Sequence, residues 1–365
     1  MKIALVYDRV NKWGGAERLL LVLHQIWPQA PLYTAVYNST TAPWAKEFKV
    51  IPSFLDRWPW AKTTHEYYPW LMPLAFESFE FKSFDLIISV TSEAAKGIIT
   101  KPDCLHLCYC LTPTRYLWSG YQDYFEKSVS RIISQPLIAY LRKWDKIASQ
   151  RPDDYLAISE NVQARIKKYY QRDSTVVYPP IDTQKWRLVP GKPENFFLAV
   201  GRLVAYKKFD LLIKAFNYLG WPLKIVGVGR EEVKLKRMAS NNIEFLGQLT
   251  DAQLLVYYQK SRAVVFPPEE DFGLVPLEAQ SCGRPVIAYR AGGAQETIVE
   301  GKTGLFFHPQ TVEALIRTLK SFRRKEFKPT VCRKNAQEFD VKIFERKIKQ
   351  LVEERWLNFQ NLKKT

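Results

Sequence analysis

The stretch KIALVYDRVNKWGGAERLLLVLHQIW, residues 2–27, shows the unit from which most of the chain is built. Its first residues, Lys2–Tyr7, form a β-branched and aliphatic run that favours a buried strand. A Gly14-Gly15 turn follows, and Ala16–Trp27 then repeats apolar residues at helical spacing, namely Leu19, Leu20, Leu23 and Ile26. The chain therefore opens with a strand, a loop and a helix.

The same alternation continues along the chain in two halves. Two consecutive prolines within Tyr178–Asp182 break any regular element, and the alternation begins again at Phe196. A helix, Glu160–Tyr170, is predicted after a Ser159 cap. The first half contains further predicted strands at Leu32–Val36, Leu86–Val90, Leu105–Cys110 and Tyr155–Ile158. The second half contains predicted strands at Phe196–Val200, Leu223–Val226, Ile243–Leu246, Ala263–Phe266, Pro285–Tyr289 and Gly304–Phe307.

Alternating β and α elements predict parallel, doubly wound sheets. At 365 residues the chain exceeds the usual size of a single core. We therefore expect an α/β fold with two Rossmann-like domains that face a cleft, residues 1–182 and 183–345. Residues 346–365 are expected to form a helix that packs back on the first domain. A helix lying on a membrane is the alternative for the terminal apolar stripe Phe344, Ile348, Leu351, Val352, Trp356 and Phe359.

The net charge of +17 calls for an anionic partner or surface. Residues 320–365 hold 14 Lys plus Arg against 6 Asp plus Glu, so the excess is concentrated near the C-terminus. This suits attraction to an anionic membrane face, worth about 1 kcal/mol per basic residue near the surface. A solvated basic helix is the alternative. No apolar run reaches the roughly 20 residues that span a bilayer, so we expect a peripheral contact.

Five cysteines in a large chain are most simply reduced thiols of a cytoplasmic protein. A metal site formed by Cys104, Cys108 and Cys110 is an alternative, but no second Cys or His pair with ligand spacing follows. No bound metal or other cofactor is therefore expected.

A cationic loop follows the first strand of the second half. Arg202 and Lys207 stand there, and such a pair can hold a diphosphate, because Arg offers a rigid fork and Lys a mobile charge. Two solvated surface cations are the alternative. Gly227 and Gly229 after the next strand could let the backbone approach a ligand, although the full dinucleotide fingerprint is absent and a plain turn explains them equally well.

The most informative loop reads PPEEDFGLVPLEA, residues 267–279, and places Glu270 and Glu278 eight residues apart. Pro276 suits the first turn of a helix, so 273–275 would present free backbone N–H groups to an anion. Glu278 would then lie in that first turn, where it can accept hydrogen bonds from ribose hydroxyls. Glu270 can meet sugar hydroxyls, whereas a helix cap plus a solvated loop charge is the alternative.

Two glycine pairs complete the candidate loops. Gly292 and Gly293 end a later strand, and consecutive glycines there suggest either an anion-binding nest or a tight turn. Gly14 and Gly15 precede the first helix and could likewise face a phosphate or a sugar.

Taken together, these loops resemble the large retaining glycosyltransferase family 4, the group 1 glycosyltransferases of GT-B architecture, over essentially the whole chain. The resemblance rests on GGAE at 14–17, VGRLVAYKKFDLLIKAF at 200–216, IVGVG at 225–229, FLGQLTDAQL at 245–254, the Glu270–Glu278 segment and AGGAQE at 291–296.

The resemblance implies a role for each matching residue. Arg202 and Lys207 would bind the donor diphosphate, Glu270 the donor sugar and Glu278 the ribose. Backbone groups of Phe272, Gly273, Leu274 and Val275 would help to hold phosphate and sugar, and Gly15, Gly227, Gly247 and Gln248 would also border the donor. The family transfers sugar with retention and typically without a metal, and this chain has no Asp-x-Asp motif.

The stretch CYCLTPTRYLW, residues 108–118, is similar to bacterial surface-polysaccharide enzymes that often use GDP-mannose. Many of these have a His where this chain has Leu111, and Leu cannot hydrogen-bond a hydroxyl or relay a proton. Arg115 and Tyr116 are the nearby substitutes, and with Gly14 and Leu111 they form the expected acceptor or sugar side. His106 lies mid-strand, where a structural role is usual.

We therefore expect a hexosyltransferase that uses a GDP- or UDP-sugar, with mannose from GDP-mannose as the first choice. Its partners would be a lipid-linked or saccharide acceptor and, peripherally, the inner face of the plasma membrane, with no nucleic acid. A UDP-hexose-dependent transferase and a non-catalytic nucleotide-sugar-binding protein are the alternatives. A third interpretation, a nucleic-acid-binding protein, is supported by the net charge alone, because the sequence contains no recognition motif. A sugar epimerase acting on UDP-sugars is a further alternative, because such an enzyme shares the two-domain shape.

Overall fold

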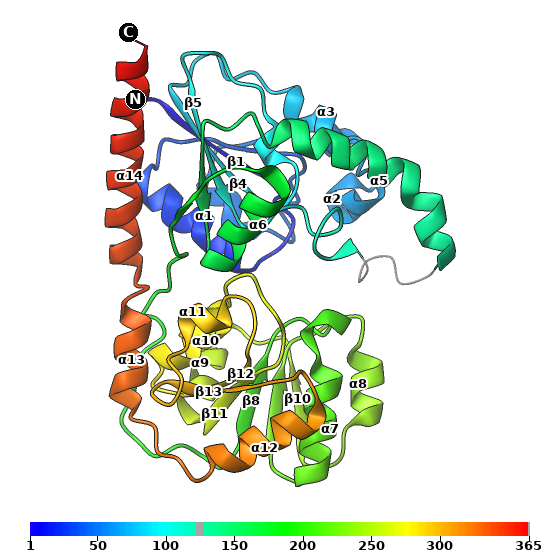
Figure 1. Cartoon of the computed structure of the whole chain (residues 1–365), viewed down its shortest axis with the longest axis vertical. Helices are drawn as coiled ribbons and strands as arrows, with labels where there is room; N and C mark the ends of the chain where they lie inside the picture. Colours follow the sequence, from blue (N-terminus) through cyan, green and yellow to red (C-terminus); the bar gives the residue numbers. More distant parts are fainter. Residues whose placement is uncertain (122–127, 364–365) are drawn as a thin grey trace. The chain divides into compact units, whose positions relative to one another are not determined.

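The computed structural model describes residues 1–121 and 128–363, apart from the side chains of 128–134. The chain divides into two compact units. Unit 1 comprises Met1–Pro179 and Phe344–Thr365, and unit 2 comprises Pro180–Ile343. Each unit is built around one parallel sheet (Figure 1).

The sheet of unit 1 has seven strands in the order β3-β2-β1-β4-β5-β6-β7. Leu5 of the central strand β1 pairs with Leu32 on one side and with Ile88 on the other. The strands are β1 (Ile3–Tyr7), β2 (Leu32–Thr34), β3 (Val50–Pro52), β4 (Leu86–Thr91), β5 (Leu105–Cys110), β6 (Asp154–Ala157) and β7 (Thr175–Val176). The helices are α1 (Gly15–Ile26), α2 (Ala61–Thr64), α3 (Met72–Glu77), α5 (Ser128–Ala148) and α6 (Glu160–Tyr170), with short 3-10 turns η1 (Pro43–Glu47), η2 (Phe54–Arg57), η3 (His65–Tyr67) and η4 (Ala95–Gly97).

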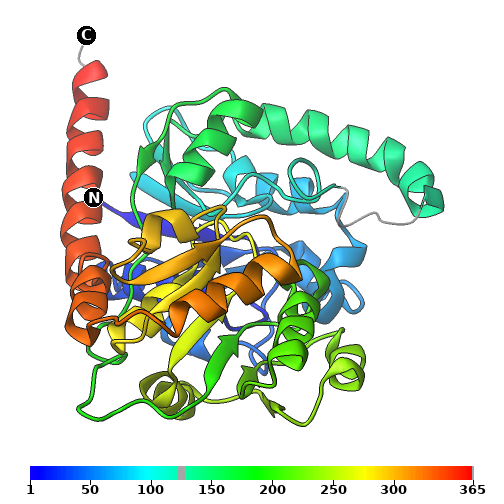
Figure 2. The same cartoon turned by 60° about the horizontal axis from the view of Figure 1, so that its bottom comes forward.

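The sheet of unit 2 has six strands in the order β10-β9-β8-β11-β12-β13. Helices α7 and α12 lie side by side against it, and together with the strands they enclose one apolar core (Figure 2). The strands are β8 (Phe197–Val200), β9 (Leu223–Val226), β10 (Ile243–Gly247), β11 (Ala263–Phe266), β12 (Val286–Tyr289) and β13 (Gly304–Phe307). The helices are α7 (Phe209–Leu219), α8 (Glu232–Met238), α9 (Asp251–Lys260), α10 (Leu274–Ser281), α11 (Ala294–Thr297), α12 (Val312–Phe322) and α13 (Pro329–Gln337). The 3-10 turn η5 (Ala205–Lys207) precedes α7.

These sheets confirm the predicted α/β class with two doubly wound parallel sheets. Every predicted strand is present, and the Ser159 side chain accepts a hydrogen bond from the Val162 N–H at the start of α6, as predicted. The strands β3 and β7 were not predicted, because three and two residues are too short to show a period.

The strand orders identify one special point in each sheet. The order reverses at β1 and β4 in unit 1, and at β8 and β11 in unit 2. Loops that leave neighbouring strands in opposite directions open a crevice at the carboxyl ends of such strands, where doubly wound sheets bind ligands. The candidate loops of Gly14, of Arg202 and Lys207, and of Glu270 leave the sheets at these points, after β1, β8 and β11.

The C-terminal helix α14 (Val341–Leu362) belongs to unit 1 from Phe344 onward. The Phe344 ring packs edge-on against Tyr109 at 6.3 Å, and Lys347 Nζ donates to the Val176 carbonyl at 2.9 Å. The four inward-facing residues Phe344, Ile348, Leu351 and Val352 are buried. Among the described residues, no helix combines the length and the apolar character that a membrane crossing requires.

The three cysteines of the first half lie buried on or beside β5. Burial raises the pKa of Cys104 to about 11 and of Cys108 to about 12. A thiol with such a pKa is a poor source of the thiolate that binds metals. In the part of the chain that the structure describes, no three His, Cys, Asp or Glu side chains cluster as metal ligands would.

Candidate functional site

In unit 2, the first strand at the reversal point leads into a cationic loop. β8 ends at Val200, and Arg202 and Lys207 follow within the next seven residues. The Arg202 side chain is exposed, and its Nη2 donates to the Tyr206 hydroxyl at 3.2 Å. Lys207 ends the turn η5 and is largely buried. One cation is therefore exposed at the surface and the other is largely buried.

The second strand at the reversal point brings a carboxylate to the fixed cation. Glu270 follows β11, and its Oε1 forms an ion pair with Lys207 Nζ. Since β8 and β11 are neighbours in the sheet, this contact joins residues 63 positions apart in the sequence. The structure thus brings Lys207 and Glu270 together, and a bound diphosphate would compete with the carboxylate for the ammonium group.

The helix that follows presents its N-terminus at the same edge. Gly273 caps α10 with a φ of 94°, a left-handed conformation that favours glycine. The first N–H groups of a helix, here those of Leu274 and Val275, have no partner within the helix and suit an anion. The Phe272 ring is buried and lies 5.9 Å from Phe339, so only its backbone is available to a ligand.

Glu278 lies just beyond the first turn of the helix, in which it was expected. α10 begins at Leu274, so Glu278 is its fifth residue rather than a member of the first turn. The dipole of the helix end therefore acts on it less than expected. A different feature orients it: the buried Tyr258 hydroxyl of α9 donates to Glu278 Oε2 at 2.7 Å. The sequence analysis missed Tyr258, because nothing in a local pattern links two helices separated by a strand.

Two glycines of the candidate loops are required by close backbone packing. A Cβ at Gly227 would lie 1.9 Å from the Gly201 carbonyl oxygen, and one at Gly292 would lie 2.2 Å from that of Glu270. The Gly293 N–H also donates to the Glu270 carbonyl at 2.9 Å. The backbone of Gly292 and Gly293, where an anion-binding nest or a tight turn was predicted, therefore packs against the loop of Glu270 and fixes its position.

The loop after β10 is more open. Gly247 has a φ of 67°, a Cβ added there would meet no atom within 4 Å, and Gln248 beside it is exposed. The Gly247 carbonyl accepts from the Gly227 N–H at 2.8 Å. These two residues thus lie at the carboxyl end of β10, two strands away from the cationic loop after β8.

In unit 1 the glycine pair precedes α1. Gly14 is the N-cap residue and is extended, and Gly15 begins the helix. Glu17 of the same motif is buried and accepts a hydrogen bond from the Tyr7 hydroxyl at 2.6 Å. That acid therefore ties the helix to β1.

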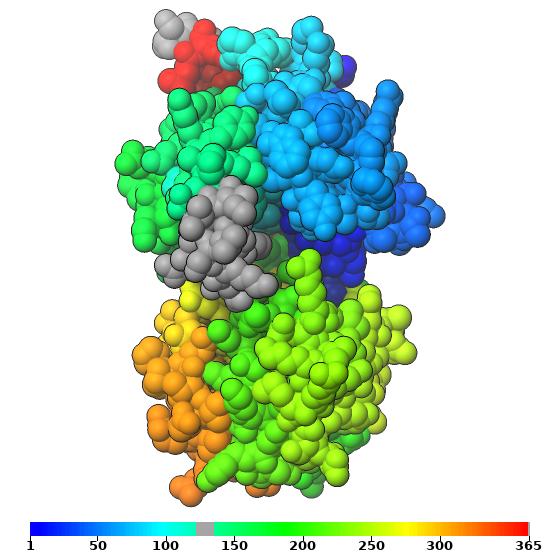
Figure 3. All heavy atoms as spheres, turned by 90° about the vertical axis from the view of Figure 1, so that its right-hand side faces the viewer, coloured from blue at the N-terminus to red at the C-terminus, as the bar shows by residue number. Residues whose placement is uncertain are grey.

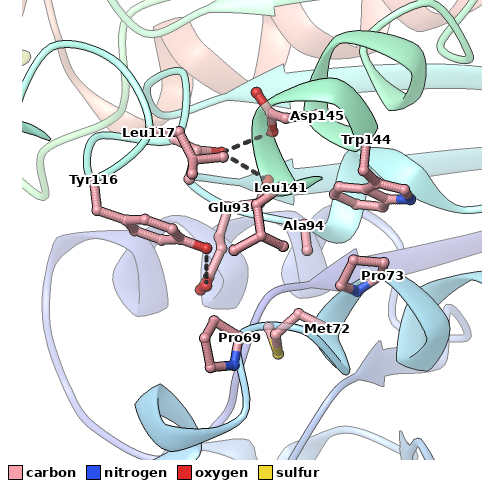
Figure 4. A pocket seen from close by; sticks show the side chains of 11 residues that line it. Pro69, Met72, Pro73, Glu93, Ala94, Tyr116, Leu117, Leu141, Trp144 and Asp145 are labelled. Atoms are coloured by element: carbon pink, nitrogen blue, oxygen red, sulfur yellow. Dashed lines mark hydrogen bonds between the residues drawn. The ribbon is translucent and has the colours of Figure 1, made fainter. Parts of the chain in front are cut away.

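A partly buried polar cluster at the reversal point of unit 1 joins Tyr116 to two residues that the sequence analysis missed, Arg9 and Glu93. Glu93, just after β4, accepts hydrogen bonds from Arg9 Nη1 at 2.6 Å and from the Tyr116 hydroxyl at 3.1 Å. Figure 4 shows Tyr116 and Glu93 pointing toward one another in a pocket of this unit. Burial raises the pKa of Glu93, and Arg9 works in the opposite direction. The signal was available, because Arg9 and Glu93 each follow the end of a central strand.

Beside this cluster, an ion pair holds the loop that carries the residues expected on the acceptor side. Lys96 Nζ lies 2.5 Å from Asp145 Oδ1, and each side chain is 1% exposed. Asp145 also accepts from the Thr114 hydroxyl at 3.0 Å and from Trp118 Nε1 at 2.7 Å. Arg115 and Tyr116 lie between these anchors. Leu111 follows β5, and its N–H donates a hydrogen bond to the Thr91 carbonyl. His106 is fully buried mid-strand and bonds Ser89 at 2.8 Å.

Relatives of known name match the chain in part. An O-antigen chain mannosyltransferase C of Escherichia coli is 30% identical over 244 residues, which are 61% of this chain and 63% of that protein. A GDP-mannose-dependent monoacylated alpha-(1-6)-phosphatidylinositol monomannoside mannosyltransferase of Corynebacterium glutamicum is 31% identical over 193 residues, 44% and 50% of the two chains. Across three of the curated relatives that match, the chain spans 56% to 63% of their length.

The fold has a close counterpart among solved structures. The Anabaena protein HepE, crystallised in complex with UDP, superposes with a TM-score of 0.69 at 19% identity, covering 97% of this chain and 100% of that one. At this identity the likeness concerns the fold alone, and it confirms the predicted GT-B class. Residues 180–339 match the model of the family described as glycosyl transferases group 1. Over these residues, which lie in unit 2, the chain is similar to the group 1 glycosyl transferases.

Proposed function

We propose that this protein is a retaining glycosyltransferase that moves a hexose from a nucleotide sugar to a lipid-linked or saccharide acceptor in surface-polysaccharide synthesis. The observation that carries the proposal is the pairing of Lys207 with Glu270 at the point where the strand order of unit 2 reverses. A cation, a carboxylate and the N-terminus of α10 meet at one edge of the sheet, which suits a ligand with both phosphate and hydroxyl groups.

Each part of the edge has a role in the proposed reaction. Arg202 and Lys207 hold the diphosphate and stabilise its charge as it leaves, while Glu270 is released from Lys207 to accept hydroxyl hydrogens of the sugar. Glu278, oriented by Tyr258, accepts the ribose hydroxyls. Since cations and a helix end supply the stabilisation, the reaction proposed here uses no metal ion.

The donor we favour is GDP-mannose. Two relatives support this choice, because one is named a mannosyltransferase and the other a GDP-mannose-dependent mannosyltransferase. A UDP-hexose is the alternative, supported by the UDP bound to the protein of like fold. Nucleotide sugars are made in the cytoplasm, so we place the protein there, in peripheral contact with the inner face of the plasma membrane. No nucleic-acid partner is proposed.

A second candidate follows from Leu111. This half-buried aliphatic residue follows β5 at the acceptor side and has no polar group for a hydroxyl. If Arg115 and Tyr116 do not replace that group, the protein binds a nucleotide sugar without transferring it.

Product analysis separates the two. The protein is incubated with radiolabelled GDP-mannose or UDP-glucose and a lipid extract, and both sugar transfer and nucleoside diphosphate release are followed. Transfer from one donor supports the enzyme. Donor binding without turnover, together with turnover gained by Leu111→His, supports the binding protein. Neither binding nor turnover with any donor would refute both.

A further inference from the structure

One buried carboxylate ties together the loops that follow the two central strands of unit 1. Asp8, directly after β1, is 1% exposed. Its carboxylate accepts hydrogen bonds from three backbone N–H groups after β4, those of Ser92, Ala94 and Ala95, at 2.6–2.9 Å. Glu93 stands within this loop, so its backbone is fixed at the point where the strand order reverses and where doubly wound sheets bind ligands.

The side chain of Glu93 is held at both oxygens. Arg9 Nη1 lies 2.6 Å from Oε2 in an ion pair, and the Tyr116 hydroxyl donates to Oε1 at 3.1 Å (Figure 4). Burial, and after it the negative charge of Glu93, raise the pKa of Tyr116 well above its ordinary value, so the phenol keeps its hydrogen. That hydrogen points at Glu93, and the phenol oxygen can act only as an acceptor toward any further group.

The direction of this hydrogen bond decides which ligand groups Tyr116 can bind. A tyrosine hydroxyl has one hydrogen to donate, and Glu93 takes it. A ligand group that meets the phenol oxygen therefore has to be a donor. A sugar hydroxyl is a donor, whereas an ionised phosphate has only acceptor oxygens. The pair thus suits a hydroxyl and not a phosphate.

The charges around the pair also suit a neutral ligand. Glu93 and Asp145 line the same pocket, and each carboxylate has its own cation. Arg9 pairs with Glu93 at 2.6 Å, and Lys96 pairs with Asp145 at 2.5 Å. The four groups sum to no net charge, which gives an anion no advantage over a neutral ligand.

Apolar side chains form most of the remaining lining of the pocket. Pro69, Met72 and Leu117 are among them, and the last two are almost completely buried. Pro69 and Met72 belong to the stretch from η2 to α3, residues 54–77, whose blue atoms cover a broad area of one face of unit 1 in Figure 3. Apolar walls with a few oriented polar groups are typical of sites that bind small molecules.

We propose that Tyr116 contacts a hydroxyl of the acceptor sugar, and that Glu93, held by Arg9, is the positioning residue that fixes Tyr116 as a hydrogen-bond acceptor. This rests on the proposed function and specifies its acceptor, because the group that Tyr116 recognises is a sugar hydroxyl and not a lipid phosphate. A lipid-linked acceptor must then already carry a sugar when it binds.

Acceptor kinetics test this with the full chain. The probes are the octyl glycosides of mannose, glucose, galactose and N-acetylglucosamine at saturating donor, and the best acceptor among them is the parent of a series of monodeoxy analogues. Tyr116→Phe should lower kcat/KM for the parent by about tenfold, as expected for one lost hydrogen bond, and leave donor affinity in calorimetry unchanged. Tyr140→Phe, which removes the hydroxyl of a 49% exposed tyrosine from α5, is the matched control and should behave as wild type.

The analogues separate a contact from a structural role. Measured as inhibitors of transfer to the parent, one analogue should bind wild type about tenfold more weakly than the others, because it lacks the hydroxyl that Tyr116 meets. In Tyr116→Phe this difference should disappear, since the analogue and the variant remove the same bond.

Glu93→Gln should give the same pattern although Tyr116 is intact. The amide oxygen turns to Arg9, so the amide N–H donates to the phenol oxygen and occupies it. Calorimetric unfolding checks that each variant is folded, and if Tyr116→Phe is not, the comparison in Glu93→Gln decides.

Three outcomes overturn the proposal. Both variants react like wild type, or they weaken the parent and every analogue by the same factor, which would assign Tyr116 a structural role, or wild type glycosylates a lipid extract but none of the four octyl glycosides. In each of these cases transfer to an acceptor persists and the proposed function stands. Absence of transfer from any donor to any acceptor refutes the proposed function instead.

Discussion

Replacing Lys96 by methionine tests the buried ion pair beneath the loop of Thr114 and Trp118. Lys96 and Asp145 are each 1% exposed and lie 2.5 Å apart. Burial alone would lower the pKa of Lys96, but Asp145 more than offsets this, so the pKa is raised and the lysine stays charged. The variant leaves a buried carboxylate without its cation.

Removing one partner of a buried pair typically costs about 3–5 kcal/mol. We expect the lower end, about 3 kcal/mol, because Thr114 and Trp118 still donate to Asp145. For a unit of this size that corresponds to a fall in unfolding temperature of about 6–12 °C. Scanning calorimetry measures it, and unit 2 should unfold as in wild type.

The control and the rescue sharpen this test. Lys101→Met removes a partly exposed partner of Asp103, 3.2 Å away, and should leave the transition unchanged. Adding Asp145→Asn to Lys96→Met should recover part of the loss, since no unpaired charge then remains. The reasoning is refuted if the unfolding temperature of Lys96→Met lies within a degree or two of that of wild type. It is also refuted if adding Asp145→Asn to Lys96→Met lowers the unfolding temperature by as much as Asp145→Asn lowers it in the wild-type protein.

Three further predictions concern packing, orientation and pH. Gly292→Ala places a Cβ 2.2 Å from a carbonyl oxygen, so it should lower the free energy of unfolding by more than the strain of positive φ alone and should abolish donor binding. Gly247→Ala, also at positive φ but with nothing within 4 Å, should lower the free energy of unfolding by only about 1–2 kcal/mol in denaturant titration. Equal losses of unfolding free energy in the two variants would contradict the packing argument. Tyr258→Phe should weaken nucleotide-sugar binding but not inorganic diphosphate binding in calorimetry, because it frees the Glu278 carboxylate; unaltered binding of both ligands would count against that role. Burial lowers the pKa of His106 to about 3, so the unfolded state binds the extra proton and stability falls as the pH drops from about 6.5 toward 3. His106→Gln should reduce the slope of unfolding free energy over that window by up to about 1.4 kcal/mol per pH unit, and an unchanged slope would show that this histidine does not titrate as described.

The fold could be predicted where local patterns are strong. Buried parallel strands are short apolar runs bounded by loops, so β1 and β8 were found from composition and spacing alone. The edge strands β3 and β7 were missed, since their identity depends on pairing with a neighbour and not on their own residues. Ser159 was found because a cap acts within three residues.

The candidate site could be predicted residue by residue but not contact by contact. Lys207 and Glu270 were both chosen from their loops, whereas their pairing depends on the order of strands in the sheet. Tyr258 and Glu93 were not chosen, because each acts through a partner on another element. Orientation of a charged group by a distant neighbour is the kind of feature that a single sequence does not display.

The central claim is that Lys207 and its neighbours hold a nucleotide-sugar diphosphate. Isothermal titration with GDP-mannose, UDP-glucose and the free diphosphates, without added metal, tests it most directly on wild type, Lys207→Met and the control Lys214→Met, an exposed lysine of α7. We predict binding of one nucleotide family, weakened about tenfold or more in Lys207→Met, as expected for a charge-assisted contact, and unaltered in Lys214→Met. Absence of binding by any nucleotide, or equal binding by all three proteins, would contradict the account.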